Sequence, residues 1–83
     1  MRHTVTYLSE AQNELADIWN RARNKQAVST AANRIDRELK NDPEEKADWL
    51  YGDWLYVEPP LAVVFRIIEE DRKVEITQVW FKE

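Results

Sequence analysis

The 83-residue sequence contains no cysteine, a single glycine and a single histidine. Without cysteine, disulfide frameworks and the common thiolate-based zinc sites are excluded. With a single glycine, the glycine-rich loops that cradle phosphate groups are excluded as well. No apolar run approaches the roughly 18–20 residues of a membrane-spanning helix, and the polar start MRHTVTYLSE does not have the pattern of a signal peptide. We therefore expect a cytoplasmic protein without a membrane partner.

The charges are unevenly distributed along the chain, although the formal net charge is only −4. The stretch 21–40 is basic, whereas the stretch 42–58 is strongly acidic and also aromatic. Because phosphate neutralisation supplies most of the affinity for nucleic acids, an acidic chain of this kind is not expected to bind one. The balance of 43% hydrophobic and 34% charged residues indicates a folded protein, and we expect one domain spanning 1–83.

Hydrophobic periodicity predicts one strand, two helices and three further strands, in that order. The alternation in His3–Leu8 predicts the first strand, and Ser9 with Gln12 has the spacing of a capping box that begins a helix. The segment NKQA separates this helix from a second one, which ends before Asp42-Pro43. The remaining strands are expected at 54–58, 61–68 and 73–81. We therefore predict an α+β fold, β-α-α-β-β-β, with a helical hairpin on one face of a mostly antiparallel sheet.

Three stretches of the sequence resemble the RelE/ParE superfamily of bacterial toxin–antitoxin systems. They are YLSEAQNELADIW in the first helix, AANRIDRELKNDP in the second helix and PPLAVVFRIIEEDRKVEITQVW in the closing strands. These stretches are most similar to the short plasmid-stabilisation members of the family. The resemblance implies a RelE/ParE-like fold and a natural toxin neutralised by an antitoxin. Such a toxin acts either as a ParE-like gyrase inhibitor or as a RelE-like mRNA endonuclease.

The sequence departs from this family pattern in the acidic stretch. Relatives typically carry a polar, glycine-containing loop there, with a serine-arginine pair and a second arginine. This chain instead has Asp48-Trp49-Leu50 and Trp54-Leu55-Tyr56, without arginine. Basic positions that would suit RNA have thus become aromatic ones.

The sequence contains no pattern that predicts catalysis, a metal site or a cofactor. Arg66 matches a position that is often arginine in the family, but a cross-strand pair with Glu75 is the simpler interpretation. His3 is expected to be an exposed strand residue, and Trp19 and Phe65 are expected in the core. Trp80 is ambiguous because its strand changes phase near Gln78. We predict that the protein is not an enzyme, with RelE-like ribonuclease activity as the alternative.

The stretch ADWLYGDWLY, residues 47–56, carries the densest group of aromatic side chains. Alternation predicts that Leu55 and Val57 face the helices, which leaves the rings for the far side of the sheet or its edge. Tryptophan and tyrosine interspersed with acids are typical of protein-binding hot spots. The alternative is that the rings close a second small core. The predicted partner-binding surface, with its two aspartates as polar rim, comprises Asp48, Trp49, Leu50, Tyr51, Asp53, Trp54 and Tyr56.

Two origins are compatible with such a surface. A natural toxin would use it to receive an antitoxin or a cellular target. An engineered scaffold of the same family would use it to bind a chosen target, as a designed binder does. Because the unusual residues are concentrated in one patch on a family-like framework, the sequence favours the second. The leading hypothesis is thus a protein-binding module without catalysis.

Overall fold

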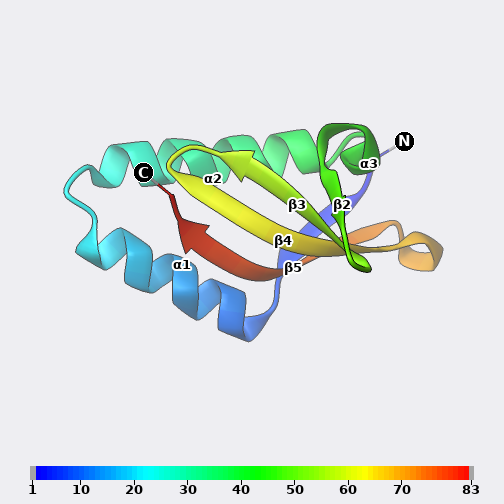
Figure 1. The fold of residues 1–83 in the computed structure, drawn as a ribbon, viewed down its shortest axis with the longest axis horizontal. Helices are drawn as coiled ribbons and strands as arrows, with labels where there is room; N and C mark the ends of the chain where they lie inside the picture. The colour runs from blue at the N-terminus through cyan, green and yellow to red at the C-terminus, as the bar shows by residue number, and fades with distance from the viewer. Residues whose placement is uncertain (1, 83) are drawn as a thin grey trace.

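The structure is a computed structural model that describes residues 2–82. Its five strands form one sheet in the order β1-β5-β4-β3-β2 (Figure 1). β1 is parallel to β5, and the other three neighbouring pairs are antiparallel. Along the chain the elements are β1 (Thr4–Tyr7), α1 (Ser9–Arg21), α2 (Lys25–Leu39), α3 (Pro43–Lys46), β2 (Asp48–Leu50), β3 (Asp53–Glu58), β4 (Leu61–Ile68), the 3-10 turn η1 (Glu69–Asp71) and β5 (Lys73–Phe81).

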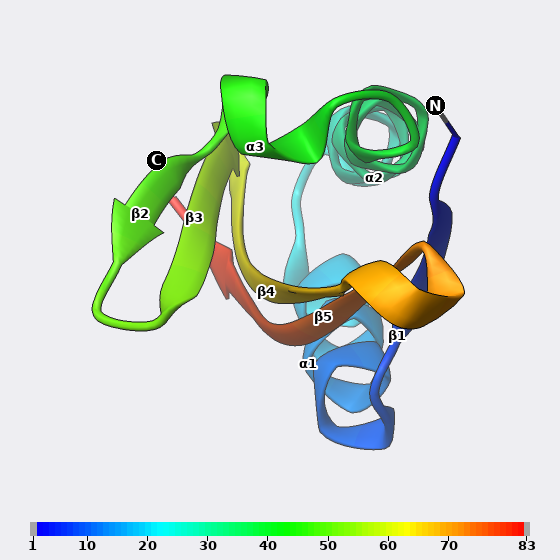
Figure 2. The same ribbon diagram turned by 90° about the vertical axis from the view of Figure 1, so that its right-hand side faces the viewer.

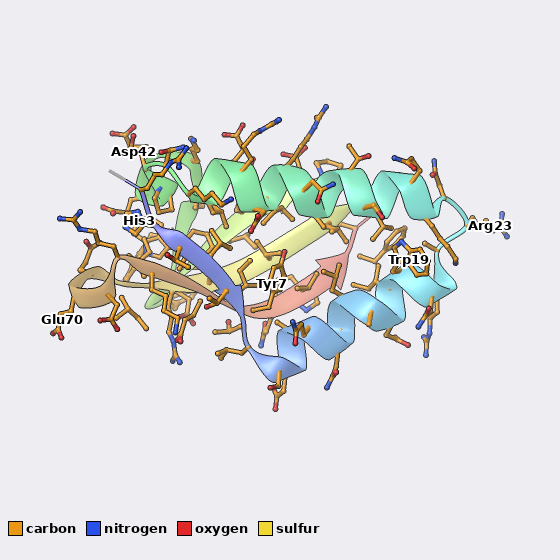
Figure 3. All side chains as sticks on the ribbon, turned by 180° about the vertical axis from the view of Figure 1, so that it is seen from behind. His3, Tyr7, Trp19, Arg23, Asp42 and Glu70 are labelled. Atoms are coloured by element: carbon orange, nitrogen blue, oxygen red, sulfur yellow. The ribbon has the colours of Figure 1, made fainter. Side chains whose placement is uncertain are left out.

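The two long helices form a hairpin that covers one face of the sheet. Seen from behind, α2 crosses in front of β4, and α1 runs beside β5 (Figure 3). Seen from the end, the sheet curves around α2, with β3 on one side and β1 on the other (Figure 2). The predicted α+β fold is therefore confirmed. The structure adds α3 and β2, which are four and three residues long and too short for a periodic pattern to reveal.

The hydrophobic core lies between the helices and alternate residues of the two central strands. Its buried members are Ala11, Val28, Ala31, Ile35, Leu39, Leu61, Val63, Phe65, Val74, Ile76 and Val79. The spacing of three and four residues in α2 and of two residues in β4 shows why these elements form, since each has one continuous apolar face. The core position expected for Phe65 is confirmed.

The connection between α1 and α2 corrects two of the predictions. Ser9 is the first helical residue of α1 and makes no side-chain capping hydrogen bond, so the predicted cap is wrong. Trp19 is 41% exposed rather than buried, because its indole lies against the start of α2. It donates to the Ser29 hydroxyl at 3.1 Å, and the Lys25 ammonium lies 5.0 Å from the ring centre. Asn24 provides a cap that the sequence analysis missed, because its side chain accepts from the Ala27 amide at 3.0 Å.

β5 contains one extra residue relative to β4. Val64 pairs with Gln78 and Phe65 pairs with Ile76, so Thr77 is the inserted residue of a β-bulge. The bulge restores Val79 to the helix-covered face and turns Trp80 to the opposite face. This is the phase change that made Trp80 ambiguous in the sequence. Within residues 2–82, neither long helix has the length and hydrophobicity of a membrane-spanning segment.

Candidate functional site

The predicted site folds as a β-hairpin at the outer edge of the sheet. β2 pairs with β3 in antiparallel register, and Tyr51 and Gly52 form the two-residue turn between them. Both turn residues have positive φ, +44° at Tyr51 and +96° at Gly52, as a type I′ turn requires. This turn matches the right-handed twist of the strands that it joins. We refer to residues 48–58 as the edge hairpin.

The first half of the edge hairpin exposes its large side chains. Trp49 is 63% exposed, Leu50 is 38% exposed and Tyr51, at the tip, is 98% exposed. The Trp49 ring meets the ring of Trp54 edge-on, with centroids 5.0 Å apart and an interplanar angle of 73°. Edge-to-face contacts of this kind are favourable because the positive edge of one ring meets the negative face of the other. Trp49 is thereby held in a defined orientation while most of its surface stays accessible.

The second half of the edge hairpin corrects the prediction for Trp54 and Tyr56. Trp54 is paired with Phe65 and Tyr56 with Val63, so both rings lie on the helix-covered face of the sheet. Both rings are partly buried and pack against the core. The prediction assigned the two strand faces the wrong way round. The rings of Trp54 and Tyr56, which are larger than the side chains of Leu55 and Val57, cover the part of the core where α2 packs against β3.

Tyr56 also connects the edge hairpin to α2 through a carboxylate. Its hydroxyl donates to Glu58 Oε1 at 3.0 Å, and Glu58 Oε2 lies 3.6 Å from the Arg34 guanidinium. Burial raises the pKa of Tyr56 to about 12, and the hydrogen bond to Glu58 acts in the same direction because it stabilises the protonated phenol. Tyr56 is thus a structural residue at the base of the hairpin.

The sheet face turned away from the helices carries apolar side chains that the sequence analysis did not assign to a surface. We call it the open face. Val57 and Trp80 flank Ala62 in one cross-strand row, and they are 38% and 42% exposed. Leu55 lies in the next row, between Asp48 and Val64. The predicted polar rim is on this side too, because Asp48 is opposite Leu55 and Asp53 is opposite Leu50.

The open face also contains a compact cluster of charged side chains. The Arg66 guanidinium lies 2.8 Å from Glu75 Oε1, and the Lys73 ammonium lies 3.3 Å from Glu75 Oε2. The predicted pairing of Arg66 with Glu75 is confirmed, and the two residues are direct cross-strand neighbours. The hydrogen bond from Arg66, followed by that from Lys73, holds the pKa of Glu75 below its ordinary value. The Glu75 carboxylate thus offsets the charge of the Arg66 guanidinium.

Solved structures with the same architecture identify the fold. A chain in the RelBE2 toxin–antitoxin complex from Mycobacterium tuberculosis matches with a TM-score of 0.83 at 16% identity, over 99% of this chain and 93% of that one. A chain of the chromosomal ParDE toxin–antitoxin system from P. aeruginosa matches with a TM-score of 0.69 at 14% identity, over 99% and 98%. This chain has a RelE/ParE-like fold. No protein-family model and no curated protein matches its sequence.

The RelE/ParE-like fold supplies a framework on which this chain arranges its own surface residues. At 14–16% identity the two structural neighbours establish the backbone architecture alone. The function of this RelE/ParE-like chain must therefore be argued from its own side chains. Many of its exposed large apolar side chains lie in the edge hairpin and in the apolar rows of the open face.

Proposed function

We propose that this chain is the toxin-like member of a bacterial toxin–antitoxin pair, and that it acts in the cytoplasm by binding proteins. The proposed binding surface consists of the exposed residues Trp49, Leu50 and Tyr51, with Asp48 and Asp53 as polar rim. Trp49 lies on the helix-covered side of the edge strand, whereas Leu50 and the two aspartates lie on the other side, so the proposed surface wraps around the edge and continues across the open face. In this proposal Trp54 and Tyr56 act from beneath, by fixing the hairpin on the core, rather than by touching the partner. Antitoxin and cellular target are the two partner classes.

The conformation of Tyr51 carries the proposal. Its side chain is 98% exposed, and its backbone has a φ of +44°. The left-handed region costs a residue with a Cβ roughly 1–2 kcal/mol, and asparagine or glycine is preferred at this turn position. Tyr51 thus occupies an unfavourable backbone conformation while its ring gains almost no contact within the protein. Such local strain is characteristic of residues that serve a function other than stability.

The surroundings of Tyr51 support a protein as the partner. Tryptophan and tyrosine dominate the energetics of protein interfaces because they bury much area at a small cost in conformational entropy. β2 is also an edge strand, so one side of its backbone has no neighbouring strand within residues 2–82. An extended segment of a partner can add to such an edge. The natural-toxin interpretation is supported better than the engineered-binder interpretation, because both structural neighbours come from toxin–antitoxin systems.

The pairing of Arg66 favours binding over RNA cleavage. Ribonuclease catalysis requires cations and acid–base groups that are free to contact a phosphate and a ribose hydroxyl. Arg66 is instead engaged by Glu75 at 2.8 Å. RelE-like mRNA cleavage is the competing function, and the experiment below distinguishes the two.

The test is induced expression of the chain in bacteria, with growth and mRNA integrity recorded together. We expect growth arrest with intact mRNA, and we expect Trp49→Ala and Tyr51→Ala to relieve the arrest. Loss of a hot-spot tryptophan costs about 2 kcal/mol or more, which corresponds to roughly thirtyfold in affinity. Trp19→Ala is the matched control, because Trp19 is also a partly exposed indole but lies at the helical connection. Thermal melts of the three purified variants separate loss of binding from loss of folding.

The same experiment can overturn the proposal. Ribosome-dependent mRNA cleavage that disappears in Arg66→Ala would establish the RelE-like endonuclease instead. Growth arrest that persists in folded Trp49→Ala and Tyr51→Ala would move the binding surface away from the edge hairpin. The basic helix face between Arg21 and Lys40 is then the next candidate, although Arg21 and Lys40 are already paired with Asp17 and Asp36. A small antitoxin gene immediately upstream would support either natural function.

A further inference from the structure

Three segments that are distant in the sequence meet at one end of the molecule. They are the residues before β1, the helix α3 and the turn η1 (Figures 1 and 3). His3 is fixed there by the backbone on both sides, because its own amide donates to the Lys40 carbonyl at 2.7 Å and the amide of Thr4 donates to the Arg72 carbonyl at 2.9 Å. The imidazole is therefore attached to a main chain that is hydrogen-bonded on both sides.

The two ring nitrogens of His3 lack the hydrogen-bond partners that buried polar atoms need. Both of its nitrogens are buried, and neither has a hydrogen-bond partner among the residues that the structure describes. Leaving a buried polar atom without a partner costs about 1–3 kcal/mol, and nearly all such atoms in folded proteins are satisfied. Residues 2–82 therefore leave room for a ligand at this ring.

Two carboxylates face this ring at a distance that suits an intervening ion. A ligand atom of His3 and one carboxylate oxygen each of Glu44 and Glu69 all lie within 4.8 Å of one another. A direct N–H···O hydrogen bond requires about 2.7–3.2 Å, and neither glutamate makes one with the ring. Ligand atoms that each lie about 2.0–2.2 Å from a zinc ion are separated by roughly 3–4 Å. The three ligand atoms thus lie near the separation that one shared ion would impose.

The two glutamates are supplied by turns with defined backbones. Glu44 follows Asp42, which has a φ of +48°, and the buried Pro43, whose carbonyl accepts from the Ala47 amide at 3.2 Å. Glu69 begins η1, which is closed by a hydrogen bond of 3.1 Å from the Arg72 amide to the Glu69 carbonyl. Neither Glu44 nor Glu69 has an ion-pair partner within residues 2–82. Both carboxylates are thus free to coordinate a cation.

We propose that His3, Glu44 and Glu69 bind one divalent cation of the zinc class. An imidazole nitrogen with two carboxylates suits zinc and its transition-metal neighbours, whereas calcium and magnesium prefer all-oxygen sites. Three protein ligands leave a fourth position for water. The ion joins the N-terminal segment to α3 and to η1, and it thereby stabilises the end of the sheet opposite the α1–α2 connection. Sequence reasoning did not find this site because its three ligands are far apart along the chain. The prediction that His3 is an exposed strand residue was also wrong, since His3 precedes β1 and both of its ring nitrogens are buried.

The test uses the 83-residue chain without an affinity tag, treated with chelator and then titrated with zinc chloride. His3 is the only histidine, so its ring nitrogen resonances in an NMR spectrum report on the site directly. We expect both ring nitrogens to shift and to saturate at one equivalent of zinc, with an increase in melting temperature and no response to magnesium. Calorimetry should show at least tenfold weaker binding in His3→Gln, Glu44→Gln and Glu69→Gln.

The control is Glu70→Gln, which removes a neighbouring exposed carboxylate that is not in the cluster. Its zinc affinity should equal that of the unmodified chain. Equal weakening in Glu70→Gln and Glu69→Gln would indicate diffuse attraction to acidic residues and would overturn the proposal. Ring resonances of His3 that do not move with zinc in the unmodified protein would overturn it without reference to any variant.

Discussion

The edge hairpin contains the tetrapeptide Asp-Trp-Leu-Tyr twice, at 48–51 and at 53–56. The two copies are identical in local sequence but differ in environment. In the first copy Trp49 is 63% exposed and Tyr51 is 98% exposed. In the second copy Trp54 and Tyr56 are partly buried against the core. A position in the sheet, rather than a local sequence, therefore decides which aromatic ring stabilises the fold and which is available to a partner.

The difference arises from the number of neighbours that each strand has. β3 lies between β2 and β4 and is approached by α2, so its inward rings are covered. β2 has a single neighbouring strand, and Trp49 lies directly opposite Trp54. The two tryptophans consequently share a face, and the inner one supports the outer one through their edge-on contact. Trp54 and Tyr56 of the second copy thus anchor the hairpin to the core, while Trp49 and Tyr51 of the first copy remain exposed.

The largest expected effect distinguishes the two tryptophans. Trp54→Ala should lower the free energy of unfolding by about 2–4 kcal/mol, somewhat less than for a fully buried tryptophan. Trp49→Ala should lower it by less than about 1 kcal/mol, because most of that ring is already in water. Urea denaturation of both variants measures the difference. Equal losses would mean that both copies belong to the core, and the proposed binding surface would then lose its basis.

A smaller effect is expected for the two tyrosines. Tyr56→Phe removes the hydroxyl that donates to Glu58 and should cost about 0.5–1.5 kcal/mol. Tyr51→Phe should leave stability unchanged, because the Tyr51 hydroxyl has no partner among residues 2–82 to lose. Urea denaturation at neutral pH compares the two variants. A cost as large for Tyr51→Phe as for Tyr56→Phe would contradict the assignment of roles.

The pH dependence of the folding stability provides a further test of the role of Tyr56. The pKa of Tyr56 in the folded chain is about 12, above the ordinary value of 10.0, so the folded state retains the phenol proton to higher pH. The resulting stabilisation is complete below about pH 10 and is lost as the pH rises towards 12. Burial, the larger cause, and Asp36 raise the pKa of Tyr7 to about 12 as well. Alkaline titration followed by phenolate absorbance should therefore show one fewer late-titrating group in Tyr56→Phe.

The smallest expected effect on the free energy of unfolding is an increase rather than a loss. Tyr51→Asn places the preferred Asn-Gly pair in the turn and should raise the free energy of unfolding by about 0.5–1 kcal/mol. The same substitution should weaken growth arrest, since it removes the aromatic ring at the tip. Gain of stability together with loss of activity is the expected signature of a strained functional residue. A destabilised Tyr51→Asn would show that the ring contributes to the fold after all.

The sequence was sufficient to predict the fold and part of the candidate site. The apolar stripe of α2 and the alternation in β4 identified the core, and strand pairing followed for Arg66 and Glu75. The two faces of β3 were interchanged because Trp-Leu-Tyr-Val is apolar at every position, so alternation separates two faces without indicating which is inside. The exposure of Trp80 depends on the β-bulge at Thr77, which no local sequence pattern predicts.

The position of β5 has a consequence for biosynthesis. β5 is the last of the five strands along the chain, yet it lies inside the sheet, between β1 and β4. Until it leaves the ribosome, β1 has no strand to pair with and the core lacks Val74, Ile76 and Val79. Contacts between segments that are distant in the sequence carry a large entropic cost before they form, so this domain completes its folding only after β5 has left the ribosome. A nascent chain interrupted before residue 73 is thus expected to lack a complete binding surface, since Trp80 is contributed by the final strand.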